Sequence, residues 1–185
     1  MSNKMFHIEL QKIHWLESYN DEDNLDLCAH GKVRVTIGNE IVADNSSDPD
    51  DWWSLTAMAL HLLRTLEFNH TSENKVGQCL VPSEGHHINH LPDEPMVLIE
   101  TVYPIERGVN WWVIHQDKQV RLITEANLET VIPFEGYKNQ ILQFVDKVQT
   151  FYEVSKPKTL PEEKYDREAY LKLWKEWNGM RTKWK

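Results

Sequence analysis

The chain has 185 residues, and 29 acidic against 20 basic residues give it a formal net charge of −9. This length fits one domain with its own core, and a hydrophobic content of 41% with eight tryptophans excludes a disordered chain. The negative charge disfavours direct binding to nucleic acid, which needs a basic face, and no apolar run approaches the roughly 20 residues of a membrane-spanning helix.

Alternating apolar and polar residues predict strands near the start of the chain. Residues 5–13 alternate with the period of a half-buried strand, and residues 32–37 repeat the pattern before a third run at 40–42. Gly38 and Asn39 separate the last two runs, and both residue types tolerate a positive φ. We therefore expect a hairpin there.

Residues 54–69 change to helical spacing. Their apolar positions lie three or four residues apart, at Leu55, Met58, Leu62 and Leu66. Ser54 is the expected N-cap, and we expect His61 and Arg64 on the solvent side. Residues 75–95 follow with little periodicity, which predicts a long connection with one short strand at 79–81.

The next part of the chain predicts a meander followed by two helices. The strand-like runs cover 96–103, 110–115, 119–124 and 128–132. Residues 134–153 have a clear helical stripe, and a last helix is expected from Asp166 with a stripe of Tyr170, Leu173, Trp174, Trp177 and Trp184.

These elements predict an α+β fold with one domain over 1–153. A mostly antiparallel sheet of about six strands, made of the N-terminal strand and hairpin plus the meander, would pack against two helices. Residues 154–185 would form a linker and an amphipathic, Trp-rich helix that packs on the same domain, or that mediates a homo-oligomer.

The charge is unevenly distributed along the chain. Residues 1–51 hold eleven acids and four bases, a net of −7, whereas residues 154–185 hold five acids and nine bases, a net of +4. Two acidic turns stand out: Asp21, Glu22 and Asp23, and Asp48, Asp50 and Asp51. They are either solvated loops that aid solubility or a surface that attracts a basic protein.

Tryptophan pairs offer a second sign of an interface. Trp52 and Trp53 directly follow the second acidic turn, and Trp111 and Trp112 lie within a predicted strand. Neighbours in a strand face opposite ways, so one of Trp111 and Trp112 must leave the core. Tryptophan is enriched in binding sites, although a Trp-rich core with a covered sheet face explains the same pattern.

Histidines gather in the long connection. His86, His87 and His90 lie close together, with His70 and Cys79 nearby. Zinc or another divalent metal prefers such ligands, but the spacing matches no known metal motif. Exposed loop histidines are the simpler explanation of the group, and such a group can also bind metal adventitiously during purification.

No catalytic residues are predicted. Cys28 and His30 share a strand face, but the nearby acids would raise rather than lower a thiol pKa, so a small buried cysteine is the expected role of Cys28. Phosphate-binding glycine loops and the serine-hydrolase motif are missing. Two cysteines and a start without an apolar signal segment favour a reducing, cytoplasmic location.

Two stretches carry a resemblance. Residues 26–35, Asp-Leu-Cys-Ala-His-Gly-Lys-Val-Arg-Val, and residues 55–66, Leu-Thr-Ala-Met-Ala-Leu-His-Leu-Leu-Arg-Thr-Leu, resemble a group of small, acidic, uncharacterised bacterial proteins, over 25–152. In general character the chain is similar to immunity proteins of bacterial toxin systems. The group of uncharacterised proteins implies no activity, but the acidic turns and aromatic residues, together with the likeness in character, favour a non-enzymatic protein without a cofactor that neutralises a basic toxin through an acidic, aromatic surface. The alternative is a metal-binding protein or metal-dependent enzyme that uses the histidine region.

Overall fold

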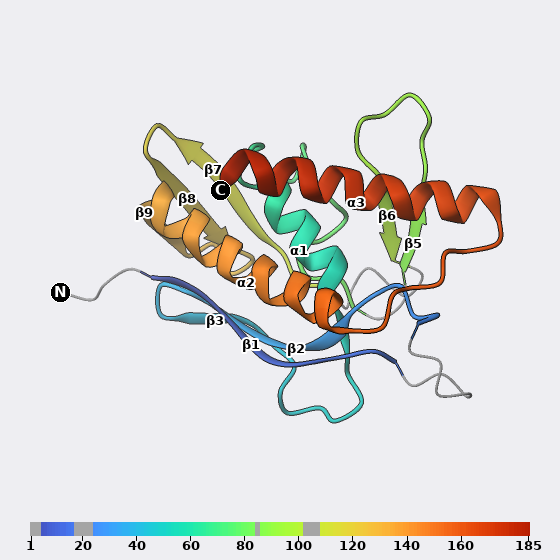
Figure 1. Ribbon diagram of the computed structural model, residues 1–185. Coiled ribbons are helices and arrows are strands. Elements are labelled where there is room, and N and C mark those ends of the chain that lie inside the picture. Colours follow the sequence, from blue (N-terminus) through green and yellow to red (C-terminus); the bar gives the residue numbers. More distant parts are fainter. Residues whose placement is uncertain (1–4, 17–23, 84–85, 102–107) are drawn as a thin grey trace.

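The computed structural model describes residues 5–16, 24–83, 86–101 and 108–185, and it confirms the α+β class (Figure 1). In chain order the elements are β1 (Phe6–His14), β2 (His30–Ile37), β3 (Glu40–Asp44), β4 (Trp53–Ser54), α1 (Leu55–Arg64), β5 (His86–Asn89), β6 (Leu98–Thr101), β7 (Trp111–Gln116), β8 (Gln119–Thr124), β9 (Glu129–Pro133), α2 (Phe134–Val154) and α3 (Lys164–Trp184).

The strands are antiparallel, as expected, but they fall into three sheets rather than one. The sheets are β1–β2–β3 with β4 beside β2, the pair β5–β6, and β7–β8–β9. The four-strand meander is wrong because β6 pairs with β5, with Ile88 opposite Ile99, instead of continuing to β7. The strand expected at 79–81 is reduced to a single bridge between Val81 and Val109.

The N-terminal hairpin follows its sequence pattern closely. Phe6 and Ile8 of β1 point into the core opposite Ile37 and Val35 of β2. The turn between β2 and β3 places Gly38 at φ +62°, a conformation that glycine adopts without steric cost. The hairpin is therefore confirmed, and its inward face forms one wall of the core.

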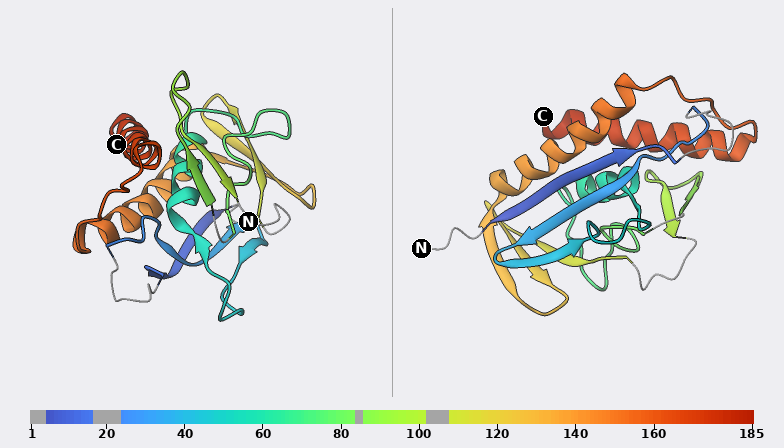
Figure 2. Two further views of the ribbon diagram at one scale, coloured as in Figure 1. Left: turned by 90° about the vertical axis from the view of Figure 1, so that its right-hand side faces the viewer. Right: turned by 90° about the horizontal axis from the view of Figure 1, so that it is seen from below.

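Helix α1 lies at the centre of the molecule. Figure 2 shows it between α2 and α3 on one side and the strands on the other. All ten of its residues are buried, so the expectation that His61 and Arg64 face solvent is wrong. The helix also ends at Arg64, earlier than predicted. Ser54 is the N-cap residue, but its hydroxyl makes no capping hydrogen bond.

The two long helices cover the same side of the core. Helix α2 confirms the predicted stripe, with Tyr137, Ile141, Phe144, Val145 and Val148 buried. Helix α3 begins at Lys164, ahead of the expected Asp166. It packs on the rest of the chain through Trp177, whose Nε1 donates to Gln149 Oε1 at 3.1 Å, and through Arg181, which pairs with Asp146 at 2.6 Å.

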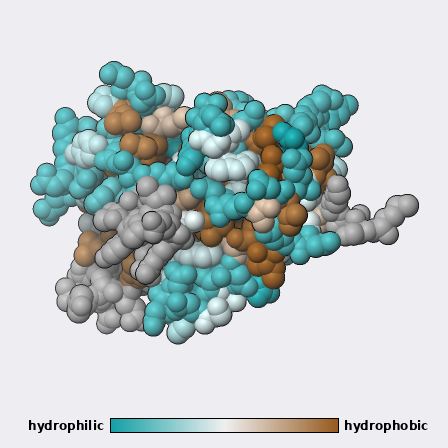
Figure 3. All heavy atoms as spheres, turned by 180° about the vertical axis from the view of Figure 1, so that it is seen from behind, coloured by the Kyte–Doolittle hydropathy of each residue, from teal (hydrophilic) through white to brown (hydrophobic). Residues whose placement is uncertain are grey.

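The sheet β7–β8–β9 has one face in the core and one on the outside. Trp111 is fully buried, whereas Trp112, Ile114, Ile123 and Val131 are only partly covered. Seen from behind, the half of the surface over this sheet carries apolar side chains among hydrophilic ones (Figure 3). Within the described parts of the chain, no helix combines the length and apolar character needed to cross a membrane.

Candidate functional site

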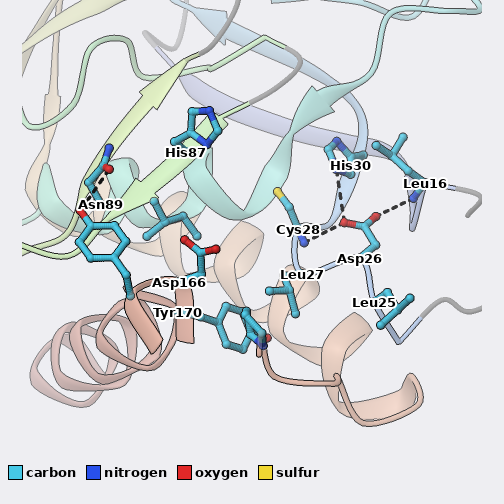
Figure 4. A pocket seen from close by; sticks show the side chains of 13 residues that line it. Leu16, Leu25, Asp26, Leu27, Cys28, His30, His87, Asn89, Asp166 and Tyr170 are labelled. Atoms are coloured by element: carbon cyan, nitrogen blue, oxygen red, sulfur yellow. Dashed lines mark hydrogen bonds and ion pairs between the residues drawn. The ribbon is translucent and has the colours of Figure 1, made fainter. Parts of the chain in front are cut away.

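A pocket of about 480 Å³ opens between the segment that leads into β2, the strand β5 and the first turns of α3 (Figure 4). We call it the α3 pocket. Its volume lies within the roughly 300–1,000 Å³ that is typical of ligand sites. Seven side chains with nitrogen or oxygen atoms line it: Asp26, His30, His87, Asn89, Tyr165, Asp166 and Tyr170. The described residues around it include no lysine or arginine.

Asp26 is held in place by the surrounding backbone. Its Oδ2 accepts a hydrogen bond from Leu16 N at 2.7 Å, and its Oδ1 accepts one from Cys28 N at 3.0 Å and lies 3.8 Å from His30 Nε2. Burial acts to raise the pKa of Asp26, but its interactions with His30 and the two backbone amides outweigh this and hold the pKa below its usual value. Asp26 is therefore an ionised carboxylate at neutral pH.

A second network fixes the same segment from behind. The Tyr152 hydroxyl donates to Leu27 O at 2.8 Å, Ala29 N donates to Thr56 Oγ1 at 2.9 Å, and the two hydroxyls lie 2.8 Å apart. Burial raises the pKa of Tyr152 well above its usual value, so the phenol remains a neutral donor. Helices α1 and α2 thus anchor the wall that carries Asp26.

Cys28 and His30 are both buried beside Asp26. The Cys28 Sγ lies 3.0 Å from the buried Ser54 Oγ, and the His30 ring faces Asp26 (Figure 4). A buried thiol that contacts a neutral hydroxyl has the environment of a packed cysteine rather than of an activated nucleophile. This arrangement favours a role in fixing the pocket wall.

We expect Asp26→Asn to lower the free energy of unfolding near pH 7 by about 1–3 kcal/mol, because the hydrogen bonds lose their charged acceptor. The pKa of Asp26 is lower in the folded than in the unfolded chain. Its contribution is therefore present above the unfolded pKa of about 3.9 and is lost as pH falls through the folded pKa. Urea unfolding between pH 7 and pH 3 measures this loss.

The difference in unfolding free energy between wild type and Asp26→Asn should become smaller as the pH is lowered. Asp166→Asn is the matched control, since it makes the same change at an exposed carboxyl in the same pocket, and it should cost much less near pH 7. A loss of unfolding free energy in Asp26→Asn that stays constant over the whole pH range would contradict the lowered pKa of Asp26 in the folded chain.

The second acidic turn is built on a buried scaffold. Asn45 is 2% exposed; its amide donates to Gly31 O and Asp51 O at 3.2 and 2.9 Å, and its Oδ1 accepts from Val33 N at 3.0 Å. Lys32 Nζ donates to the carbonyls of Asn45 and Asp48. The turn is therefore a fixed loop, which we call the acidic loop (residues 44–51).

The acidic loop presents some of its carboxylates to solvent. Asp48 and Asp50 are exposed, Asp51 is half-buried, and Asp44 pairs with Arg34 at 2.8 Å. Among the ion pairs of the described residues, none involves Asp48 or Asp50. The first acidic turn, with Asp21, Glu22 and Asp23, lies outside the described residues.

The two tryptophans after the acidic loop have different surroundings. The Trp52 ring lies 4.5 Å from both Lys12 Nζ and Lys32 Nζ and stacks edge-on against His14 at 4.1 Å. Trp53 is 6% exposed, and as part of β4 it pairs with Gly31 of β2. Only Trp52 therefore offers surface to a partner.

The predicted metal ligands of the histidine region lie in different environments in the structure. His70 is buried and bonded to Asn110 Oδ1 and Val76 N, and burial lowers its pKa, which favours the neutral ring. Cys79 is buried too, and this raises the pKa of its thiol to about 11. His87 borders the α3 pocket, and His90 borders a separate cavity beside Lys172.

In the part of the chain that the structure describes, the side chains of the histidine region are not arranged as metal ligands. His86 is in β5, opposite Thr101. The described part of the chain contains no group of three histidine, cysteine, aspartate or glutamate side chains placed to hold a metal ion. The metal site remains a prediction from the sequence without a geometric counterpart among these residues.

Compared with known proteins, the chain matches no family model, no curated protein and no solved structure. The site therefore has to be interpreted from its own geometry.

The sequence did not point to the α3 pocket. Asp26 belonged to an acidic run, Asp166 had the position of a helix cap, and Tyr170 belonged to an apolar stripe. Each residue has a sufficient local explanation, and the pocket forms only because three segments far apart in sequence meet. The i, i+4 spacing of Asp26 and His30, which form an ion pair, was the one local signal available.

Proposed function

We propose that this chain is a non-enzymatic protein that binds a basic protein partner through the acidic loop and Trp52, in the manner of an immunity protein that neutralises a toxin. The observation that supports this best is the buried Asn45, which fixes the loop from within. A loop that only aids solubility needs no such support. A preorganised loop loses less conformational entropy on binding, which favours affinity.

The charge of the loop indicates the chemistry of the partner. Four aspartates lie within residues 44–51 without a lysine or arginine among them, and Asp48 and Asp50 are exposed. Such a surface accelerates association with a positively charged partner and discriminates against an acidic one. A nuclease toxin would be such a positively charged partner, because the face with which it binds nucleic acid is basic.

The proposed place of binding is the cytoplasm. Cys28 and Cys79 are both buried and form no disulfide with each other, which suits a reducing compartment.

We expect the neighbouring gene to encode a toxin that this chain binds, and Asp48→Lys/Asp50→Lys to weaken that complex at least tenfold. The substitution replaces attraction by repulsion at two fixed positions, so the salt dependence of binding should also fall. Isothermal titration calorimetry of the purified pair at two salt concentrations measures both effects.

Glu73→Lys/Glu125→Lys is the matched control, because it makes the same change of net charge at exposed turns elsewhere in the chain. This control should weaken binding much less. Equal losses in the two double variants would show that total charge matters and the loop does not. A neighbouring product that fails to bind would contradict the proposal.

A further inference from the structure

The α3 pocket has the charge of a site for a cation. Two carboxylates, Asp26 and Asp166, stand on different walls, and the described lining contains no lysine or arginine. Its basic groups are two imidazoles: that of His30, which lies 3.8 Å from Asp26, and that of His87. Figure 4 shows the carboxylate of Asp166 directed into the space below His87, while Asp26 lies on the wall formed by the segment before β2. Asp26 is fixed by hydrogen bonds, whereas Asp166 is exposed.

The remaining walls suit an uncharged arm that carries the cation. Five apolar side chains contribute to the lining: Leu16, Leu25, Leu27, Ile88 and Pro161. Tyr165 and Tyr170 add aromatic rings, and the Tyr165 hydroxyl is held by Asn89 Oδ1 at 3.3 Å. Apolar and aromatic walls contact methylene groups well, and aromatic rings also attract cations over their faces.

We propose that the α3 pocket receives a lysine or arginine side chain of the protein partner, with its charged end between Asp26 and Asp166. This inference rests on the proposed function, because it assumes a basic partner, but it uses a different surface from the acidic loop. The long methylene stem would pack on the leucines, and the charged head would meet the carboxylates. Arginine would add a planar group that pairs with a carboxylate through two parallel hydrogen bonds.

The pocket can be tested without the partner. Nα-acetyl-arginine N-methylamide and its citrulline counterpart have nearly the same shape and differ in charge. We expect the arginine compound to bind the full chain at least fivefold more tightly, followed by amide chemical shifts in NMR spectra, with the largest changes at Cys28, His30 and Asn89.

Asp166→Asn should weaken binding of the arginine compound about 1.5-fold to fivefold, the range expected for one exposed ion pair. Asp166 is exposed at the start of α3, so the variant should remain folded. Glu125→Gln, at an exposed position outside both the pocket and the acidic loop, is the control and should leave the affinity for the compound unchanged.

Each other outcome overturns the inference. Equal binding of the citrulline compound, or no shift at these residues at tens of millimolar probe, would show that the pocket does not select a cation. Tighter binding of free arginine than of the capped compound would assign the pocket to a free amino acid. These results concern the pocket alone, whereas failure of the proposed function would appear in the Asp48→Lys/Asp50→Lys experiment with the partner.

Discussion

Arg64→Met is expected to lower the free energy of unfolding by about 3–5 kcal/mol, the usual cost of breaking a buried ion pair from one side. Arg64 is 3% exposed, and its Nε and Nη2 donate to the two carboxylate oxygens of Glu176 at 2.6 and 3.0 Å. The substitution leaves the Glu176 carboxylate buried without its counter-charge. Two further bonds, to the carbonyls of Val76 and Val97 at 2.7 Å each, are lost as well.

The ion pair also joins distant parts of the chain. Arg64 ends α1, Glu176 lies in the middle of α3, and Glu176 Oε2 accepts from Val97 N at 3.0 Å. Its loss should therefore loosen α3 as well as destabilise the fold. Urea unfolding measures the free energy, and limited proteolysis should show earlier cleavage within 154–185 in the variant.

Two comparisons distinguish the buried pair from ordinary surface charge. Arg34→Met removes an arginine that pairs with Glu9 and Asp44 at the surface, and it should change stability little. Arg64→Met/Glu176→Met removes both charges and should be less destabilised than Arg64→Met alone. A double variant that loses the sum of both single losses would contradict this account.

Arg64 also shows why the sequence pattern misplaced part of α1. The spacing of its leucines is that of a one-sided helix, and His61 and Arg64 then fall on the polar side. In the structure α2, α3 and β2 pack around this helix, and the partner of Arg64 lies 112 residues away. A charge satisfied at that distance leaves no local signal, so a pattern argument places it in solvent.

The β5–β6 pair was missed for a different reason. Residues 86–89, His-His-Ile-Asn, have only one apolar residue, so no alternation marks them as a strand. Their register comes from the pairing with β6, which holds Ile88 opposite Ile99. By contrast, the Gly38 hairpin and the α2 stripe were predicted correctly, because turn chemistry and a core-facing stripe are local properties.

Trp111→Ala is expected to lower the free energy of unfolding by about 3–5 kcal/mol, whereas Trp112→Ala should cost no more than about 1 kcal/mol. Both residues are tryptophans of β7, so the two variants lose the same side chain and the same strand propensity and differ only in burial. Trp111 is 0% exposed, and its ring centroid lies 6.1 Å from that of Phe6. Trp112 lies on the outer face of the sheet, 5.4 Å from the His70 ring.

Chemical denaturation with far-UV circular dichroism measures both variants, and Trp111→Phe serves as a milder replacement if Trp111→Ala does not fold. The expected order of stability is wild type, Trp112→Ala, Trp111→Phe and Trp111→Ala, from highest to lowest. Similar losses for the two alanine variants would mean that the outer face contributes to the fold as much as the core does. A small loss of unfolding free energy in Trp112→Ala would show that the fold does not depend on the Trp112 ring. The partly exposed Trp112, Ile114 and Ile123 would then form an apolar surface that is not explained by stability.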